Sequence, residues 1–274
     1  MIYEKIFLDV PNEDEPVLLT AYLPENSDQI DPDRTRKTVI LCPGGGYRFV
    51  SDREAEPVAL QLMAADINVF ILTYNVFTKE QFPQQQLELA RAIQYVKENA
   101  QRYHVKDGKV IVMGFSAGGH LACCLGTMYN DPILTKPLNA SPEDIRPDGM
   151  VLSYPVITAG QFAHEDSFRR LFGTEDRSVW EQGSLEKRVH PGTPPTFLWT
   201  THEDALVPME NTLLLANALR KNGVSMELHI FPHGPHGLSI NTPNVYGPKV
   251  QSVSFTAPEI NVWLSLAKRW IDEL

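Results

Sequence analysis

The chain has 274 residues, of which 43% are hydrophobic and 21% are charged, and these values exclude disordered, collagen-like and coiled-coil proteins. Its formal net charge is −10, from 24 basic and 34 acidic residues. This balance argues against a nucleic acid partner, because phosphate binding requires clustered lysine and arginine.

Strand-like and helix-like segments alternate along the chain, which predicts a mostly parallel sheet of about eight strands with helices on both faces. The expected strands are 2–10, 17–23, 37–42, 68–74, 109–115, 149–154, 196–200 and 225–231. The expected helices are 54–65, 84–100, 118–129, 209–222 and 259–274. Residues 24–37 are polar, and the basic group at 34–37 is expected to be part of a solvated loop. No linker or repeat divides the chain, so we expect one α/β domain over residues 1–274.

The segment 158–195 interrupts this alternation and is longer than an ordinary connection. Insertions of this length are often lids or pocket walls, and some are structured excursions. The segment holds four large aromatic side chains, at Phe162, Phe168, Phe172 and Trp180. These side chains could wall an acyl pocket or form the core of the insertion, and the sequence leaves both interpretations open.

The strongest local motif is Gly-Phe-Ser-Ala-Gly at residues 114–118, between a β-branched strand and a helix. A nucleophile elbow needs this context, because the glycines permit a sharp turn that raises the Ser116 hydroxyl above the sheet edge. The backbone amide of Ala117 would then point towards an oxyanion at the helix N-terminus. A glycine-rich turn with a bystander serine is the alternative. For His120, on the following helix, we expect packing or hydrogen bonding rather than catalysis.

A nucleophilic serine needs a base and an acid that orients the base, and in this architecture the chain order is serine, acid, histidine. Candidates for both follow later strands, where Glu203 neighbours Asp204 and where His233 and His236 compete. We favour Asp204, with Glu203 as a solvated neighbour. We also favour His236, because a flanking glycine lets its loop reach over the sheet, and His233 would then be structural.

A glycine run, Pro-Gly-Gly-Gly-Tyr at residues 43–47, follows the strand that ends at Cys42. In this place its backbone N–H groups can face the same oxyanion as Ala117. A phosphate-binding loop is the alternative. It fails in detail, because no Gly-Lys-Ser/Thr follows and the spacing is not that of a dinucleotide-binding motif.

At this point the sequence resembles the α/β-hydrolase superfamily, and more narrowly the bacterial carboxylesterases related to hormone-sensitive lipase and to acetylxylan esterases. The resemblance covers nearly the whole chain. The segments that carry it are 43–47, 53–57, 114–122, 153–157, 204–208 and 234–237.

This resemblance implies ester hydrolysis through an acyl-enzyme, with Ser116 as nucleophile, His236 as base and Asp204 as its orienter. It also implies three oxyanion donors, the backbone amides of Gly45, Gly46 and Ala117. Members of this branch act on short acyl chains, often acetyl groups on sugars.

One departure concerns the head of the glycine run, where lipase-like relatives carry histidine and this chain has Pro43. The change favours the sugar-esterase branch. Tyr47, Arg48 and Arg53 follow the run and could bind a sugar hydroxyl. The alternative for the two arginines is a set of surface ion pairs with the acids at positions 52, 54 and 56.

The three cysteines, Cys42, Cys123 and Cys124, fit neither a disulfide framework nor a zinc site, so we expect buried free thiols. The charged first residues do not resemble a signal peptide, and no run is apolar enough to span a membrane. We therefore expect a cytoplasmic enzyme without metal or cofactor, with no membrane partner, as a monomer or a homo-oligomer.

The expected function is a serine carboxylesterase for short acyl esters, chiefly acetyl esters of sugars or xylo-oligosaccharides. A serine peptidase or a lipase-like hydrolase on the same scaffold is the first alternative. A hydrolase-fold binding protein without catalytic activity is the second, because a fold does not fix a function.

Overall fold

The computed structural model describes residues 1–76, 81–246 and 258–274. Its strands are β1 (Ile2–Leu8), β2 (Val17–Leu23), β3 (Arg36–Cys42), β4 (Asn68–Thr73), β5 (Val105–Phe115), β6 (Gly149–Ser153), β7 (Thr196–Thr201) and β8 (Met226–Phe231). They form one eight-stranded sheet in the order β1-β2-β4-β3-β5-β6-β7-β8. The pairs β1–β2 and β2–β4 are antiparallel, and all other neighbours are parallel. The predicted mostly parallel sheet is confirmed.

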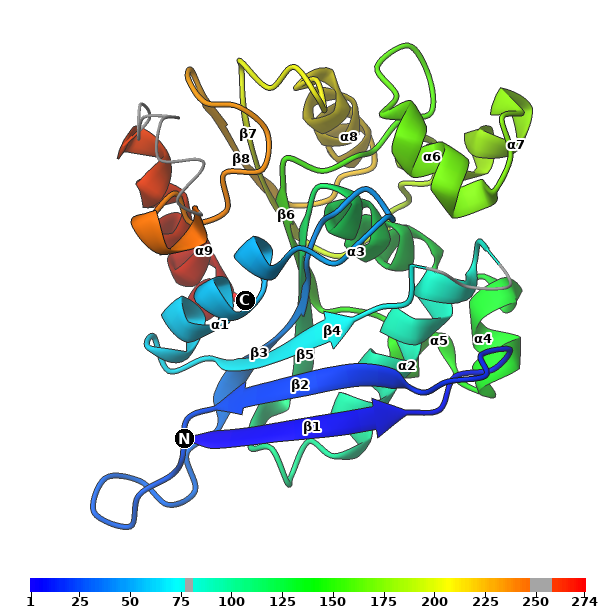
Figure 1. The fold of residues 1–274 in the computed structure, drawn as a ribbon. Coiled ribbons are helices and arrows are strands. Elements are labelled where there is room, and N and C mark those ends of the chain that lie inside the picture. Colours follow the sequence, from blue (N-terminus) through cyan, green and yellow to red (C-terminus); the bar gives the residue numbers. More distant parts are fainter. Residues whose placement is uncertain (77–80, 247–257) are drawn as a thin grey trace.

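Helices cover both faces of this sheet (Figure 1). The helices are α1 (Glu56–Met63), α2 (Gln84–Glu98), α3 (Ala117–Met128), α4 (Pro132–Leu138), α5 (Pro142–Ile145), α6 (Glu165–Phe172), α7 (Arg177–Trp180), α8 (Glu210–Lys221) and α9 (Val262–Glu273). Helices α1 and α9 pack on one face, and α2, α3 and α8 pack on the other. In the described residues, no helix combines the length and the apolar character that crossing a bilayer requires.

The core follows from the alternation of side chains along the central strands. In β3, Val39 and Leu41 join the cluster beneath α1 and α9, whereas Ile40 and Cys42 join the cluster beneath α2, α3 and α8. All four side chains are fully buried. The cysteines are buried free thiols, as expected.

The short helices α4 and α5 lie in a stretch for which the sequence pattern gives no expected element. Each begins with a capping residue and a proline in its first turn. The Asp131 carboxylate accepts the N–H of Ile133, and Ser141 forms a capping box with Asp144. One or two turns are too short to show a 3.6-residue period, so their caps are the one local signal.

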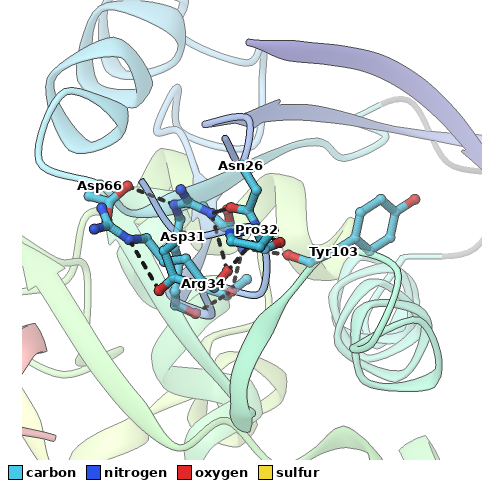
Figure 2. Close-up of polar contacts among 9 residues, drawn as sticks. Asn26, Asp31, Pro32, Arg34, Asp66 and Tyr103 are labelled. Carbon is cyan, nitrogen blue, oxygen red and sulfur yellow. Dashed lines mark hydrogen bonds and ion pairs between the residues drawn. The ribbon is translucent and has the colours of Figure 1, made fainter. Parts of the chain in front are cut away.

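The basic group at 34–37 is not the solvated loop that its polarity suggests. Arg36 opens β3 and is 5% exposed, and its Nε donates to Asp66 Oδ1 at 2.7 Å. Its Nη1 also donates to Asn26 Oδ1. The neighbouring Arg34 donates to Asp66 at 3.0 Å and lies 4.0 Å from Asp31 (Figure 2). Burial is possible because Asp66, just before β4, supplies the opposite charge.

The insertion at 158–195 contains α6, α7 and three-ten turns. Phe168 and Trp180 stack with ring centroids 6.1 Å apart, and both are 1% exposed. They pack with Val156 and Val207 in a small separate cluster. Phe168, Phe172 and Trp180 therefore form or pack against the core of the insertion, which decides between the two interpretations for these three side chains. Phe162 does not belong to this cluster.

Candidate active site

Ser116 lies in a tight turn between β5 and α3, with φ 53° and ψ −120°. A residue with a side chain rarely adopts this backbone conformation, which is found where surrounding packing enforces it. A β-carbon on Gly114 would lie 2.2 Å from the carbonyl oxygen of Gly118, and one on Gly118 would lie 2.1 Å from that of Cys42. Glycines at both positions therefore let the turn pack directly against β3.

Three predicted side chains meet in a continuous hydrogen-bonded chain. His236 Nε2 lies 2.8 Å from Ser116 Oγ, and His236 Nδ1 lies 2.7 Å from Asp204 Oδ2. The Asp204 side chain is 1% exposed, and its other oxygen accepts the N–H groups of Leu206 and Val207. Because a carboxylate accepts at Nδ1, that nitrogen carries the proton, and Nε2 is left to accept the serine hydroxyl proton.

These residues come from the carboxyl ends of separate strands. Ser116 follows β5, Asp204 follows β7 and His236 follows β8. Gly234 and Gly237 have φ of 122° and 77°, which lets the last loop fold back over the sheet edge. The carboxyl edge of the parallel strands is where ligand sites form in sheets of this type.

The neighbouring acid and histidine form a second pair outside the first. Glu203 Oε1 lies 3.0 Å from His233 Nδ1, and Oε2 accepts the N–H of Gly234 at 3.0 Å. The pairing lowers the pKa of Glu203 and raises the pKa of His233. Glu203 is thus more than the solvated neighbour expected from the sequence, because it fastens the loop that carries His236.

The glycine loop after β3 provides backbone donors beside Ser116. Among residues 1–76, 81–246 and 258–274, no acceptor pairs with the N–H groups of Gly45, Gly46 or Ala117. The Gly45 carbonyl accepts the N–H groups of Arg48 and Phe49, so the loop closes on itself. A β-carbon on Gly45 would lie 1.9 Å from the Phe49 carbonyl oxygen. This close approach requires glycine.

A buried carboxylate and a buried phenol support this loop. Glu54 Oε2 accepts the N–H of Gly44 at 2.8 Å, and Glu54 Oε1 accepts the hydroxyl proton of Tyr154 at 2.7 Å. The Tyr154 oxygen in turn accepts the N–H of Ser239 at 3.0 Å, and its ring stands edge-on to the His236 ring at 5.0 Å. Burial raises the pKa of Tyr154 well above its usual range, so the phenol stays a donor.

The sequence suggested for Glu54 only a surface ion pair with an arginine and assigned no role to Tyr154, although both lie in segments that carry the resemblance, 53–57 and 153–157. The sequence could not reveal the hydrogen bond between Glu54 and Tyr154, because these residues are 100 positions apart in the chain.

A pocket of about 320 Å³ opens above Ser116. Nine of its fourteen lining residues carry polar side chains, and the lining consists of Gly45, Gly46, Arg48, Phe49, Ser51, Arg53, Glu54, Ser116, His164, Asp166, Arg170, Leu206, His236 and Gly237. Arg53 is therefore at the pocket, as expected.

Three expected substrate contacts are corrected by the structure. Tyr47 is 2% exposed and its hydroxyl bonds His120 Nδ1 at 2.9 Å, behind the glycine loop. Phe168 is buried in the insertion core, and Phe172 packs against Phe82 and Phe168. Their apolar surface is used in packing, which removes it from the pocket.

His120 has the packing and hydrogen-bonding role that its position predicts. Its Nε2 donates to the Gly183 carbonyl at 2.9 Å, so its Nδ1 accepts the Tyr47 hydroxyl proton. Burial lowers the pKa of His120 to about 4, which keeps the ring neutral. His120 thus connects the segment after the glycine loop to the insertion.

The insertion reaches the pocket through polar side chains of α6 and the residue before it. Asp166 and Arg170 are four positions apart and share one helix face, whereas Ser167, Phe168 and Leu171 occupy the buried face. His164 also lines the pocket, and burial lowers its pKa. Sequence reasoning missed these residues because attention to the aromatic side chains pointed to the opposite face of the helix.

Comparison with known proteins adds the family. The model of the BD-FAE family matches residues 19–219 of the chain. The chain belongs to the BD-FAE family.

Solved structures similar to this BD-FAE chain confirm the α/β-hydrolase fold. An acetyl ester-xyloside bifunctional hydrolase from Caldicellulosiruptor lactoaceticus is 35% identical with a TM-score of 0.81, covering 98% of this chain and 96% of that one. The carboxylesterase Cest-2923 from Lactobacillus plantarum is 26% identical with a TM-score of 0.86, covering 100% of this chain and 98% of that one.

Curated relatives of this BD-FAE chain are longer proteins. An endo-1,4-beta-xylanase B from Butyrivibrio fibrisolvens is 38% identical over 87% of this chain and 36% of the relative. An acetylxylan esterase from Xylanibacter ruminicola is 28% identical over 84% of this chain and 45% of the relative. The chain spans less than half the length of these two relatives. The expected relation to carboxylesterases and acetylxylan esterases is confirmed.

Proposed function

We propose that the chain is a serine carboxylesterase that removes short acyl groups, chiefly acetyl, from sugars or xylo-oligosaccharides. The observation that carries the proposal is the hydrogen-bonded chain from Asp204 through His236 to Ser116 at the base of a pocket. Membership of a family with esterase relatives supports the same reaction class.

The proposed reaction starts when Ser116 Oγ attacks the ester carbonyl while His236 Nε2 takes the hydroxyl proton. Asp204 holds the imidazole in the required tautomer and stabilises the imidazolium that forms. His236 then gives the proton to the leaving alcohol. Water attacks the acyl-enzyme in the second half, with the same imidazole acting as base.

The oxyanion of each tetrahedral intermediate would accept hydrogen bonds from the backbone amides of Gly45, Gly46 and Ala117. These donors are fixed before the reaction by the close packing of the glycine loop and the turn at Ser116. Preorganised donors of this kind are each worth about 10²–10³ in rate.

The pocket lining supports a short acyl group and a polar alcohol. Its large apolar side chains are Phe49 and Leu206, both 55% exposed. With two large apolar side chains, both half exposed, the lining offers a long acyl chain few side chains to pack against. Guanidinium, imidazole and carboxylate groups around Ser116 offer hydrogen-bond partners for sugar hydroxyls.

The test compares initial rates on p-nitrophenyl acetate, butyrate and octanoate, with Ser116→Ala as control, followed by acetylated xylo-oligosaccharides. We expect fast acetate turnover, a steep fall by octanoate, and a loss of about 10⁴-fold or more in Ser116→Ala. Preference for octanoate would indicate a lipase-like enzyme. A complete lack of Ser116-dependent turnover on every ester would favour the peptidase or binding-protein alternatives.

A further inference from the structure

Three arginines surround the pocket from three different segments. Arg48 follows the glycine loop, Arg53 lies in the three-ten turn Asp52–Glu54, and Arg170 is on α6. Arg53 Nη2 lies 3.3 Å from the place that a β-carbon on Gly237 would occupy, next to His236 in the chain. A guanidinium group therefore stands beside the proposed base.

None of these arginines has an acidic partner among the described residues. In residues 1–76, 81–246 and 258–274 the same holds for Arg146, Arg188 and Arg220, but those three do not line the pocket. Within the part of the chain that the structure describes, no carboxylate lies within ion-pair distance of Arg48, Arg53 or Arg170. By contrast, Arg177 pairs with Glu165, close to the same helix. The surface ion pairs that the sequence suggested for Arg48 and Arg53 do not form.

The two acids of the pocket lining are engaged elsewhere. Asp166 pairs with Arg169, which does not line the pocket. Both Glu54 oxygens accept hydrogen bonds, one from the Gly44 N–H and one from the Tyr154 hydroxyl. The pocket thus holds unpaired guanidinium groups on a protein whose formal net charge is −10.

We propose that the alcohol part of the substrate carries a carboxylate, as in an acetylated uronic acid or an oligosaccharide with a uronic acid unit. This inference rests on the proposed esterase function. Guanidinium pairs with a carboxylate through two parallel charged hydrogen bonds, which fixes orientation as well as charge.

The test uses two mono-acetylated methyl glycosides, one of glucuronic acid and one of glucose, acetylated at the same hydroxyl. The measured quantity is the ratio of their kcat/KM values. We expect the charged sugar to be preferred by about tenfold or more, since a hydrogen bond to a charged group is worth about that factor. Added salt should lower the ratio, because it screens exposed charges.

The variants Arg170→Gln and Arg53→Gln should each lower this ratio by about tenfold, whereas the matched control Arg177→Gln should leave it unchanged. Inhibition of p-nitrophenyl acetate hydrolysis by methyl glucuronoside, compared with methyl glucoside, gives a second readout that does not depend on the acetylated position. The glucuronoside should inhibit more strongly in the wild type and should lose this advantage in Arg170→Gln.

The outcomes separate the two proposals. A ratio near one, or a ratio that does not respond to the arginine variants, overturns the carboxylate inference and leaves the esterase proposal standing. Turnover of p-nitrophenyl acetate with neither sugar hydrolysed nor inhibitory also overturns the inference. Absence of Ser116-dependent hydrolysis of any ester overturns the proposed function itself.

Discussion

The two ends of β3 carry arginine clusters of opposite kinds. At the amino end, Arg34 and Arg36 are bound by Asp66 and by neighbouring polar groups (Figure 2). Beyond the carboxyl end, Arg48 and Arg53 line the pocket beside Ser116, and the described residues offer them no carboxylate. Partnered arginines hold segments of the chain together, whereas unpartnered arginines in a hollow are available to a ligand.

A different contrast, in burial, separates the two adjacent acids after β7, each of which pairs with a histidine. Asp204 is buried and oriented towards His236, whereas Glu203 is half exposed and pairs with His233. We expect Asp204→Asn to lower kcat by about 10³–10⁴, because an asparagine cannot hold the required imidazole tautomer. Glu203→Gln should change kcat by less than about threefold, since its bond is solvent-exposed. Steady-state kinetics on p-nitrophenyl acetate ranks the two variants, and the reverse ranking would assign the orienting role to Glu203.

The hydrogen bonds that support the glycine loop, beyond the carboxyl end of β3, should have a smaller effect on kcat. Tyr154→Phe removes the hydroxyl that bonds Glu54 and Ser239, so the loop below the oxyanion donors loses part of its anchor. We expect kcat to fall about tenfold while KM changes little, because the donors act mainly in the transition state. Tyr95→Phe, which removes a hydroxyl bonded to Tyr103, is the matched control. Equal kcat in wild type and Tyr154→Phe would show that the bond has no positioning role.

Breaking the cluster at the amino end should affect stability and leave catalysis unchanged. Arg36→Met leaves Asp66 and Asn26 without their buried donor, and we expect a loss of about 2 kcal/mol in the free energy of unfolding. Arg34→Met removes a more exposed pair and should cost less than about 1 kcal/mol. Urea denaturation measures both variants, with kcat on p-nitrophenyl acetate as the control. A drop in kcat for Arg36→Met would mean that the two ends are coupled.

The smallest expected effect concerns Glu88 on α2, a carboxyl group that is buried without a charged partner among the residues that the structure describes. Burial raises its pKa to about 8, from an ordinary value of 4.5. The folded state therefore holds a proton that the unfolded state releases, and stability falls as pH rises from about 4.5 to about 8. Near pH 8, the free energy of unfolding of Glu88→Gln should exceed that of the wild type by about 1 kcal/mol. This difference in unfolding free energy should shrink near pH 5. A difference that is constant with pH would contradict the raised pKa.

Much of the fold and of the proposed catalytic chain could be predicted because the signals are local. Ser116, Asp204 and His236 each follow a recognisable strand, and glycines flank two of them. The expected chain order of serine, acid and histidine then limits the search for the acid and the base to the loops after the later strands. The sheet could be predicted for a similar reason, since buried strands and amphipathic helices alternate with readable periods.

The substrate side of the pocket could not be predicted, because it depends on how one helix of the insertion packs. Phe168 was a candidate for the pocket wall as well as for the insertion core, but its apolar surface is better buried against Trp180, and this packing turns Asp166 and Arg170 outwards. Arg36 was misjudged for a related reason. Its charge suggested that the side chain is exposed to solvent, and its carboxylate partner Asp66 lies 30 positions away in the chain.

The insertion has a small core of its own, which includes Phe168 and Trp180. The outward positions 166 and 170 of α6 contribute nothing to the main core, so their side chains can be replaced without changing how the helix is anchored. Under the proposed function, substitutions at those two positions would change which alcohol the pocket accepts, while the strands and loops that hold Ser116, Asp204 and His236 stay as they are.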